Sequence, residues 1–276
     1  PVLKTVSVNS ADPDDRDLAW AVRGGGGASF GIITRLYFDA DKIPDVPEAV
    51  YVTSYSWDWH DSDGQLMPFE DFNDICDFFF DEYCNQDVGK WSHFGVFVMH
   101  HMDQKSLVLV DYASIKSGET YNYREWRNGA KKRFETIVAK HRVYESRGVG
   151  GHMSTSTYHL GIAGKLKKYT FLEGIQTLNG SGPNQYFKTK SAYHTAPTTK
   201  SQRRSMYKAL TTKVVNANGK KVDMSDTVFQ HDSYGGMINQ VGSDETAIFQ
   251  RNSICKIQYQ TYWDYDDLAP DVDQDD

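Results

Sequence analysis

The sequence predicts an α+β fold in which an antiparallel sheet is covered by helices on one face. Residues 50–59 alternate aromatic and polar side chains toward their end, the period of two expected of a strand with one buried face. Residues 68–84 repeat apolar side chains at three and four positions after Pro68, which predicts an amphipathic helix. The apolar runs 94–101 and 106–113 flank a short polar segment and predict a hairpin.

A domain boundary is predicted near residue 45, where the segment 39–49 carries two prolines and four acidic residues. Residues 31–38, GIITRLYF, are β-branched and aromatic and predict a buried strand before this boundary. A second packing helix is predicted over 126–137. The chain therefore divides into residues 1–45, residues 46–263 and an aspartate-rich tail, 264–276, that reads as a frayed end or a linker.

Composition narrows the class of protein. A chain of 276 residues with 13% aromatic side chains can bury a substantial core. Its net charge of -7 argues against general binding to nucleic acid, and no apolar run is long enough to span a membrane. Without CxxC or His/Cys spacing, no metal site is predicted. Cys76 and Cys84 lie about 12 Å apart on the predicted helix, too far for a disulfide.

Four consecutive glycines, residues 24–27, form the first candidate site. Their spacing does not match the dinucleotide fingerprint G-x-G-x-x-G, and no Gly-Lys-Ser/Thr follows to make a P-loop. A tight turn against a neighbouring helix would explain some of them. Four glycines exceed what a turn needs, which favours close approach of a flat or phosphorylated ligand to the backbone.

Two predicted strands near the C-terminal end form the second candidate site. Gln230 and Asp232 share one face of the first strand, and Lys256, Gln258 and Gln260 share one face of the second. These polar faces either meet water, as is common in antiparallel sheets, or bind sugar hydroxyls beside nearby aromatic rings.

Four segments together carry a resemblance to a known family: RGGGGASFGIIT, NGSGPNQYFKTKSAY, HDSYGGMINQV and IQYQTYW, in this order along the chain. They resemble the berberine-bridge-enzyme-like FAD-linked oxidases of the vanillyl-alcohol-oxidase type, and within them the carbohydrate-oxidising branch. The resemblance runs from about residue 14 to residue 263, with gaps.

This resemblance implies the end of an FAD-binding domain over residues 1–45, and a substrate domain with a large antiparallel sheet flanked by helices over 46–263. It implies oxidation of a hexose or oligosaccharide at the anomeric carbon to a lactone, with O2 reduced to H2O2. The residues that would contact the cofactor are Gly24, Gly25, Gly26, Gly27, Ser29, Phe30, Gly31 and Ile32. Those that would bind the sugar are Gln230, Asp232, Gln258 and Gln260.

The chain also departs from the family pattern. The family tethers its flavin through a His and a Cys in the N-terminal part, and its catalytic tyrosine lies in a Y-x-N-Y-like motif after the IQY strand. Neither region is present, and Tyr121–Tyr123 and Gly150–His152 are similar only in letters. We therefore expect a processed piece of a longer oxidase with its covalent anchors in a missing N-terminal segment, a companion chain or segment, and no assignable catalytic base here.

The sequon at Asn179 is a candidate glycosylation site if the protein is secreted or extracytoplasmic, which the resemblance favours. Two other functions stay open. One is a catalytically inactive relative that binds sugar or acts as an assembly subunit. The other is an oxidase of the same fold that acts on alkaloids or phenolics, for which the glutamines would be poorly suited because an apolar substrate leaves them unpaired.

Overall fold

The computed structural model describes residues 2–27, 29–84, 92–104, 106–115, 136–143, 167–176 and 186–263. The chain forms two compact units. The smaller unit combines Pro1–Asp45 with Gly235–Ser253, and the larger combines Val46–Tyr234 with Ile254–Asp276. The segment 235–253 thus folds with the first 45 residues, a grouping that the linear division of the sequence does not contain.

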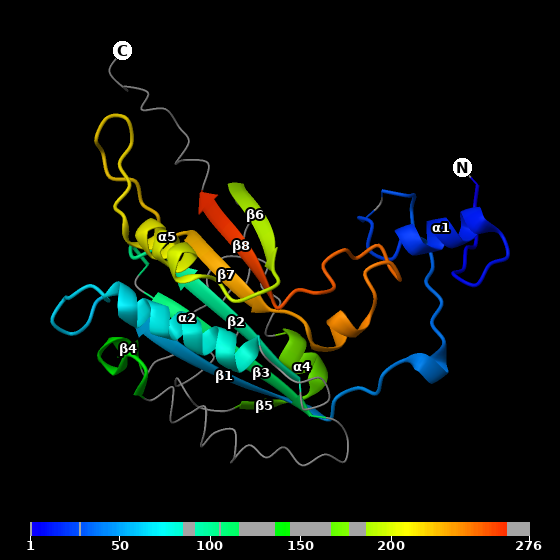
Figure 1. The fold of residues 1–276 in the computed structure, drawn as a ribbon, viewed down its shortest axis with the longest axis horizontal. Coiled ribbons are helices and arrows are strands. Elements are labelled where there is room, and N and C mark those ends of the chain that lie inside the picture. Colours follow the sequence, from blue (N-terminus) through cyan, green and yellow to red (C-terminus); the bar gives the residue numbers. More distant parts are fainter. Residues whose placement is uncertain are drawn as a thin grey trace. The chain divides into compact units, whose positions relative to one another are not determined.

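The larger unit is built on one eight-stranded sheet whose strands pair antiparallel throughout the described residues. The strand order is β4-β1-β3-β2-β7-β8-β6, and β5 also pairs with β1 (Figure 1). The strands are β1 (Ala49–Asp58), β2 (Ser92–His100), β3 (Ser106–Ile115), β4 (Arg142–Val143), β5 (Lys167–Tyr169), β6 (Tyr186–His194), β7 (Thr227–Ser233) and β8 (Cys255–Trp263). The α+β fold and the 94–113 hairpin, which is β2 and β3, are confirmed.

Helices flank this sheet on both faces. Two long helices, α2 (Phe69–Tyr83) and α5 (Lys200–Thr211), run beside each other over one face (Figure 1). The short helix α4 (Phe171–Gln176) packs against β1 from the opposite face, where Val50 lies against Gly174. The expectation of helices on one face only is therefore wrong, because the valine-rich side of β1 to β3 also needs a cover. A one-turn 3₁₀ helix, η2 (Ala139–His141), precedes β4.

Helix α2 begins where the sequence predicts, directly after Pro68. Glu70 and Asp71 occupy its first turn, where the positive end of the helix dipole favours acidic side chains. Its apolar side fills the core between the sheet and the two long helices. Fully buried members of that core include Trp57, Trp59, Phe72, Phe79 and Phe97. Each contributes roughly 1.5–3 kcal/mol through burial.

Strand β1 differs from its prediction because both of its faces are buried. Trp57 points toward α2 and α5, and its indole nitrogen donates to the carbonyl of Ile137 over 3.2 Å. Val50 and Val52 point to the opposite face and join a second apolar cluster with Val96, Val98, Val108 and Val110. The alternation of aromatic and polar side chains identified the strand. It could not show that the second face of β1 would also be buried by neighbouring residues.

The smaller unit contains α1 (Pro13–Ala21) and two 3₁₀ helices, η1 (Ala40–Lys42) and η3 (Gly236–Gln240). Its two stretches of chain are joined by hydrogen bonds. The indole of Trp20 donates to the carbonyl of Asp244 over 2.6 Å, and the Arg23 guanidinium donates to the carbonyl of Glu245 over 3.0 Å. These contacts explain why 235–253 belongs to this unit.

The strand predicted over residues 31–38 is not observed. The segment has no regular secondary structure, and Ile32 is 90% exposed, Leu36 68% and Phe38 73%. A strand requires a neighbouring backbone to satisfy its N–H and C=O groups, and no strand among the described residues pairs with this segment. The apolar pattern alone therefore does not make this segment a strand.

Some predicted features lie outside the described residues. They are most of the 126–137 helix, the Asn179 sequon, the 264–276 tail, and the segments Tyr121–Tyr123 and Gly150–His152.

Candidate functional site

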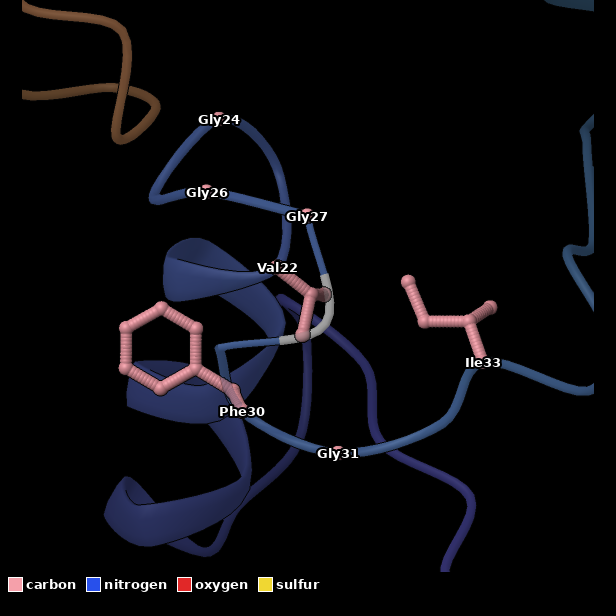
Figure 2. A pocket seen from close by; sticks show the side chains of 7 residues that line it. All are labelled: Val22, Gly24, Gly26, Gly27, Phe30, Gly31 and Ile33. Carbon is pink, nitrogen blue, oxygen red and sulfur yellow. The ribbon is translucent and has the colours of Figure 1, made fainter. Parts of the chain in front are cut away.

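A pocket of about 250 Å³ lies at the glycine run in the smaller unit. Figure 2 shows the turn above the end of α1, with the side chains of Phe30 and Ile33 on either side of Val22 in this view. The lining residues are Val22, Gly24, Gly26, Gly27, Phe30, Gly31 and Ile33. Bare backbone and apolar side chains together suit a flat or phosphorylated group, although the volume holds only part of a large cofactor.

The glycines of this run differ in what the fold requires of them. Gly24 has φ +128°, and a Cβ there would lie 3.0 Å from the backbone nitrogen of Ile248. A Cβ at Gly25 would lie 2.6 Å from the carbonyl oxygen of Ala21. A Cβ at Gly27, in contrast, would meet no atom within 4 Å. The fold itself needs Gly24 and Gly25, whereas the open space at Gly27 is available to a ligand.

Not every predicted cofactor residue lines this pocket. Gly24, Gly26, Gly27, Phe30 and Gly31 line it, but Gly25, Ser29 and Ile32 do not. Ile33, which the sequence did not single out, takes part instead. An extended segment alternates its side chains, which is the physical reason that adjacent isoleucines differ in this way.

The second candidate site is a hydrogen-bonded cluster on β7 and β8, on the sheet face opposite α2 and α5. Gln230 donates from its amide nitrogen to Asp232 Oδ1 over 2.7 Å. Gln258 donates to the other carboxylate oxygen, Oδ2, over 3.0 Å. Gln230 and Gln258 are direct neighbours across the two strands. We refer to Gln230, Asp232 and Gln258 as the Gln-Asp-Gln cluster.

The cluster presents acceptors to a ligand. Its three side chains are half-buried, and partial burial raises the pKa of Asp232 against the opposing effects of the two amide donors and of Lys256. Because each amide nitrogen is directed at Asp232, the carbonyl oxygens of both glutamines are left to accept hydrogen bonds from hydroxyl groups. Such an arrangement fits a polyol and does not fit an apolar ring.

Gln260, the fourth predicted sugar residue, is not part of this cluster. It is 6% exposed, and its side-chain oxygen accepts from the Tyr262 hydroxyl over 2.5 Å. Gln260 shares the sheet face of Gln258, but its partner on β7 is Val228. Its buried hydrogen bond to Tyr262 indicates a structural role in β8.

The structure adds Tyr193 and Ser191 of β6 to the same face. Ser191 pairs with Gln258, which itself pairs with Gln230. Tyr193 pairs with Lys256, which itself pairs with Asp232. Both residues of β6 therefore lie beside the Gln-Asp-Gln cluster. Tyr193 contacts Tyr234 edge to face, with ring centroids 5.3 Å apart. The sequence carried a signal for Tyr193 in the alternation of β6, but only the register places it beside Lys256.

Within the described residues, the structure shows neither a metal-binding cluster nor a membrane-spanning helix. No group of three or more His, Cys, Asp or Glu side chains there is arranged to hold a metal ion. None of the helices in the same residues has the length and apolar character needed to cross a bilayer.

No model of a known protein family matches the chain. Individual proteins do. Over 96% of its length the chain is 32% identical to hexose oxidase of Chondrus crispus, of which it covers 48%. Over 94% it is 26% identical to aclacinomycin-N/aclacinomycin-A oxidase of Streptomyces galilaeus, of which it covers 43%. The chain thus spans about half the length of these curated relatives.

Solved structures share the fold. A glycopeptide hexose oxidase complexed with teicoplanin matches with a TM-score of 0.65 at 19% identity, over 94% of this chain and 47% of that one. Aclacinomycin oxidoreductase matches with a TM-score of 0.64 at 23% identity, over 94% and 47%. Berberine bridge enzyme complexed with (S)-reticuline matches with a TM-score of 0.57 at 15% identity, over 91% and 42%.

The chain thus shares the fold of the berberine-bridge-enzyme-like, FAD-linked oxidases and is similar in sequence to an oxidase of known name, which confirms the resemblance that the four motifs predict. Within that class, the protein to which we find it similar at 32% identity is hexose oxidase.

Proposed function

We propose that this chain is part of an FAD-dependent carbohydrate oxidase. The substrate would be a hexose or an oligosaccharide, oxidised at the anomeric carbon. The C1 hydrogen leaves with two electrons and the C1 hydroxyl loses its proton, so that a lactone forms while O2 gains two electrons and two protons to become H2O2. The similarity to hexose oxidase supports this reaction class.

The observation that carries the proposal is the Gln-Asp-Gln cluster. Three polar side chains from two adjacent strands are mutually hydrogen-bonded and half-buried on a sheet face that also holds Lys256 and Tyr193. In this role Asp232 fixes the orientation of both glutamines, and their carbonyl oxygens accept from sugar hydroxyls. Tyr193 supplies an aromatic ring of the kind on which sugars pack. No residue here is assigned as the catalytic base.

The smaller unit would contact the flavin. Its pocket offers exposed backbone at Gly26 and Gly27 with apolar side chains at Val22 and Ile33, a lining that fits a flat, partly apolar group. A bound flavin supplies the two-electron acceptor for the sugar and the route to O2. We assign residues 1–45 to the end of the FAD-binding domain, together with 235–253, and the rest of 46–263 to the substrate domain.

Further polypeptide would complete the oxidase. The exposed apolar side chains of Ile32, Leu36 and Phe38 support a covering partner or segment, since such a run is costly to leave in water. The family resemblance favours covalent flavin anchors in that additional segment. It also favours a secreted or extracytoplasmic protein, with Asn179 as the candidate glycosylation site.

The test uses the whole oxidase that contains this chain. Visible flavin absorbance is measured first, and then H2O2 release with glucose, an oligosaccharide series, and a panel of phenols and alkaloids. We expect flavin absorbance and peroxide with sugars. A colourless preparation that releases no peroxide but binds sugar by calorimetry would establish the inactive sugar-binding relative instead.

The similarity to an aclacinomycin oxidase makes oxidation of aromatic compounds the second candidate. Peroxide release with the phenol and alkaloid panel, and none with sugars, would establish it. The Gln-Asp-Gln cluster argues against that outcome because an apolar substrate would bury its acceptors without partners.

A further inference from the structure

The chain holds three buried, free cysteines, and two of them, Cys84 and Cys255, lie 171 positions apart in the sequence. Cys84 ends α2, and Cys255 begins β8. The two thiols are close enough to influence each other, are not bonded in this structure, and both belong to the core between the sheet and the long helices. Cys76 lies eight residues earlier, in α2, where it belongs to the same core and is influenced by the charges of Asp77 and Arg203.

A separate set of contacts brings the end of α2 to the start of β8. Gly95, Ser233 and Cys255 form one row across β2, β7 and β8, because Ser233 pairs with Cys255 and its hydroxyl accepts from the Gly95 N–H over 2.9 Å. Tyr83 lies directly on Gly95, where a Cβ would come within 2.5 Å of its ring. The absent side chain at Gly95 therefore lets the last turn of α2 approach this row closely.

We propose that Cys84 and Cys255 are joined by a disulfide in the mature protein, which ties the C-terminal end of α2 to the first residue of β8. Three residues after this link comes Gln258 of the Gln-Asp-Gln cluster. The inference rests on the packing of α2 against the sheet and does not depend on the proposed oxidase activity.

The bond would form by exchange with an oxidised dithiol, such as a protein disulfide catalyst or oxidised glutathione. One cysteine thiolate attacks the disulfide of the oxidant and gives a mixed disulfide. The second thiolate then displaces the remaining sulfur. Two protein thiols lose two electrons and two protons, and the oxidant takes them up as two thiols.

The timing of this step follows from burial. The neighbouring Cys84 thiol and burial both raise the pKa of Cys255, so little thiolate exists in the folded chain. Exchange is therefore expected during folding, before the core closes. Disulfides persist in oxidising compartments, so the bond also agrees with the proposed secretion.

The experiment isolates the protein, or refolds it with reduced and oxidised glutathione, and then alkylates free thiols under denaturing conditions before mass spectrometry. We expect one alkylated cysteine, Cys76, and a digest peptide that links Cys84 to Cys255. Reduction should raise the count to three. Three alkylated cysteines without reduction would overturn the proposal.

Matched variants control for adventitious pairing. Cys76→Ser should leave no alkylatable thiol before reduction, whereas Cys255→Ser should leave two. A linked Cys76–Cys84 or Cys76–Cys255 peptide in the unmodified chain would also overturn it. If the Cys255→Ser variant does not fold, the digest of the unmodified protein decides by itself.

Discussion

Gln258 donates its side-chain amide to Asp232 Oδ2 over 3.0 Å and so joins β8 to β7 through side chains as well as backbone. Gln230 donates to the second oxygen of the same carboxylate. Asp232 is therefore the one acceptor that holds both glutamines in a fixed orientation.

Replacing this carboxylate should disturb sugar binding. In Asp232→Asn, one oxygen becomes an NH2 donor that faces a glutamine donor, so that glutamine must turn its carbonyl away from the ligand. We expect kcat/KM of the complete oxidase for its sugar to fall about 100-fold, which corresponds to about 2.7 kcal/mol. Steady-state kinetics with peroxide detection measures it. Asp223→Asn, at an exposed acid of the same unit, is the control, and equal activity in both variants would contradict the assigned role.

The glycine run allows ligand binding to be separated from folding. Gly27→Val adds a side chain where no protein atom lies within 4 Å, so it should weaken flavin retention at least tenfold without lowering the melting temperature. Gly24→Val should lower both, because its Cβ meets the Ile248 backbone in a backbone conformation that valine rarely adopts. Flavin absorbance and thermal unfolding are followed together. Unchanged flavin content in Gly27→Val would leave this pocket without a cofactor.

Buried His231 should make the larger unit sensitive to acid. Its ring lies among Phe79, Phe80 and Phe97, and complete burial lowers its pKa from 6.5 to about 3. The unfolded chain therefore binds a proton in a range where the folded chain does not. The stabilising contribution is complete above pH 6.5 and is lost as the pH falls toward 3.

At pH 5 this loss amounts to about 2 kcal/mol of unfolding free energy relative to pH 7.5. His231→Phe keeps an aromatic ring among aromatic neighbours and should remove that part of the pH dependence. Denaturant titrations at the two pH values provide the measurement. His60→Gln, at an exposed histidine, should retain the wild-type dependence. An identical pH dependence in wild type and His231→Phe would show that His231 is not the acid-sensitive group.

Two adjacent arginines on α5 should differ greatly in their contribution to stability. Arg203 is 4% exposed, donates to Thr198 over 3.0 Å and to Asn73 over 3.1 Å, and forms an ion pair with Asp77 of α2. Its removal leaves buried partners unsatisfied. We expect Arg203→Ala to cost about 3 kcal/mol.

Arg204, the neighbouring control, is exposed and lies 3.8 Å from Glu70. We expect Arg204→Ala to cost less than about 1 kcal/mol. Denaturant unfolding of both variants measures the difference, and similar losses would mean that the Arg203 contacts between α2 and α5 contribute little.

The sequence by itself predicted the elements whose pattern is local. The 68–84 periodicity, with Pro68 at its start, determined α2, and the two apolar runs determined β2 and β3. The alternation of Gln230 with Asp232, and of Gln258 with Gln260, correctly placed each pair on one strand face. The four motifs together predicted the class of oxidase to which the chain is similar.

Only the tertiary structure decided which of these residues meet. Strand register brings Gln258 to Asp232 while Gln260 bonds to Tyr262, and register depends on pairing between segments that lie far apart in the chain. The same dependence explains the strand that was predicted over 31–38 and not observed, because an apolar pattern forms a strand only where a partner backbone is available. It also explains Cys84 and Cys255, which no spacing in the sequence connects and which the packing of α2 on Gly95 brings near each other.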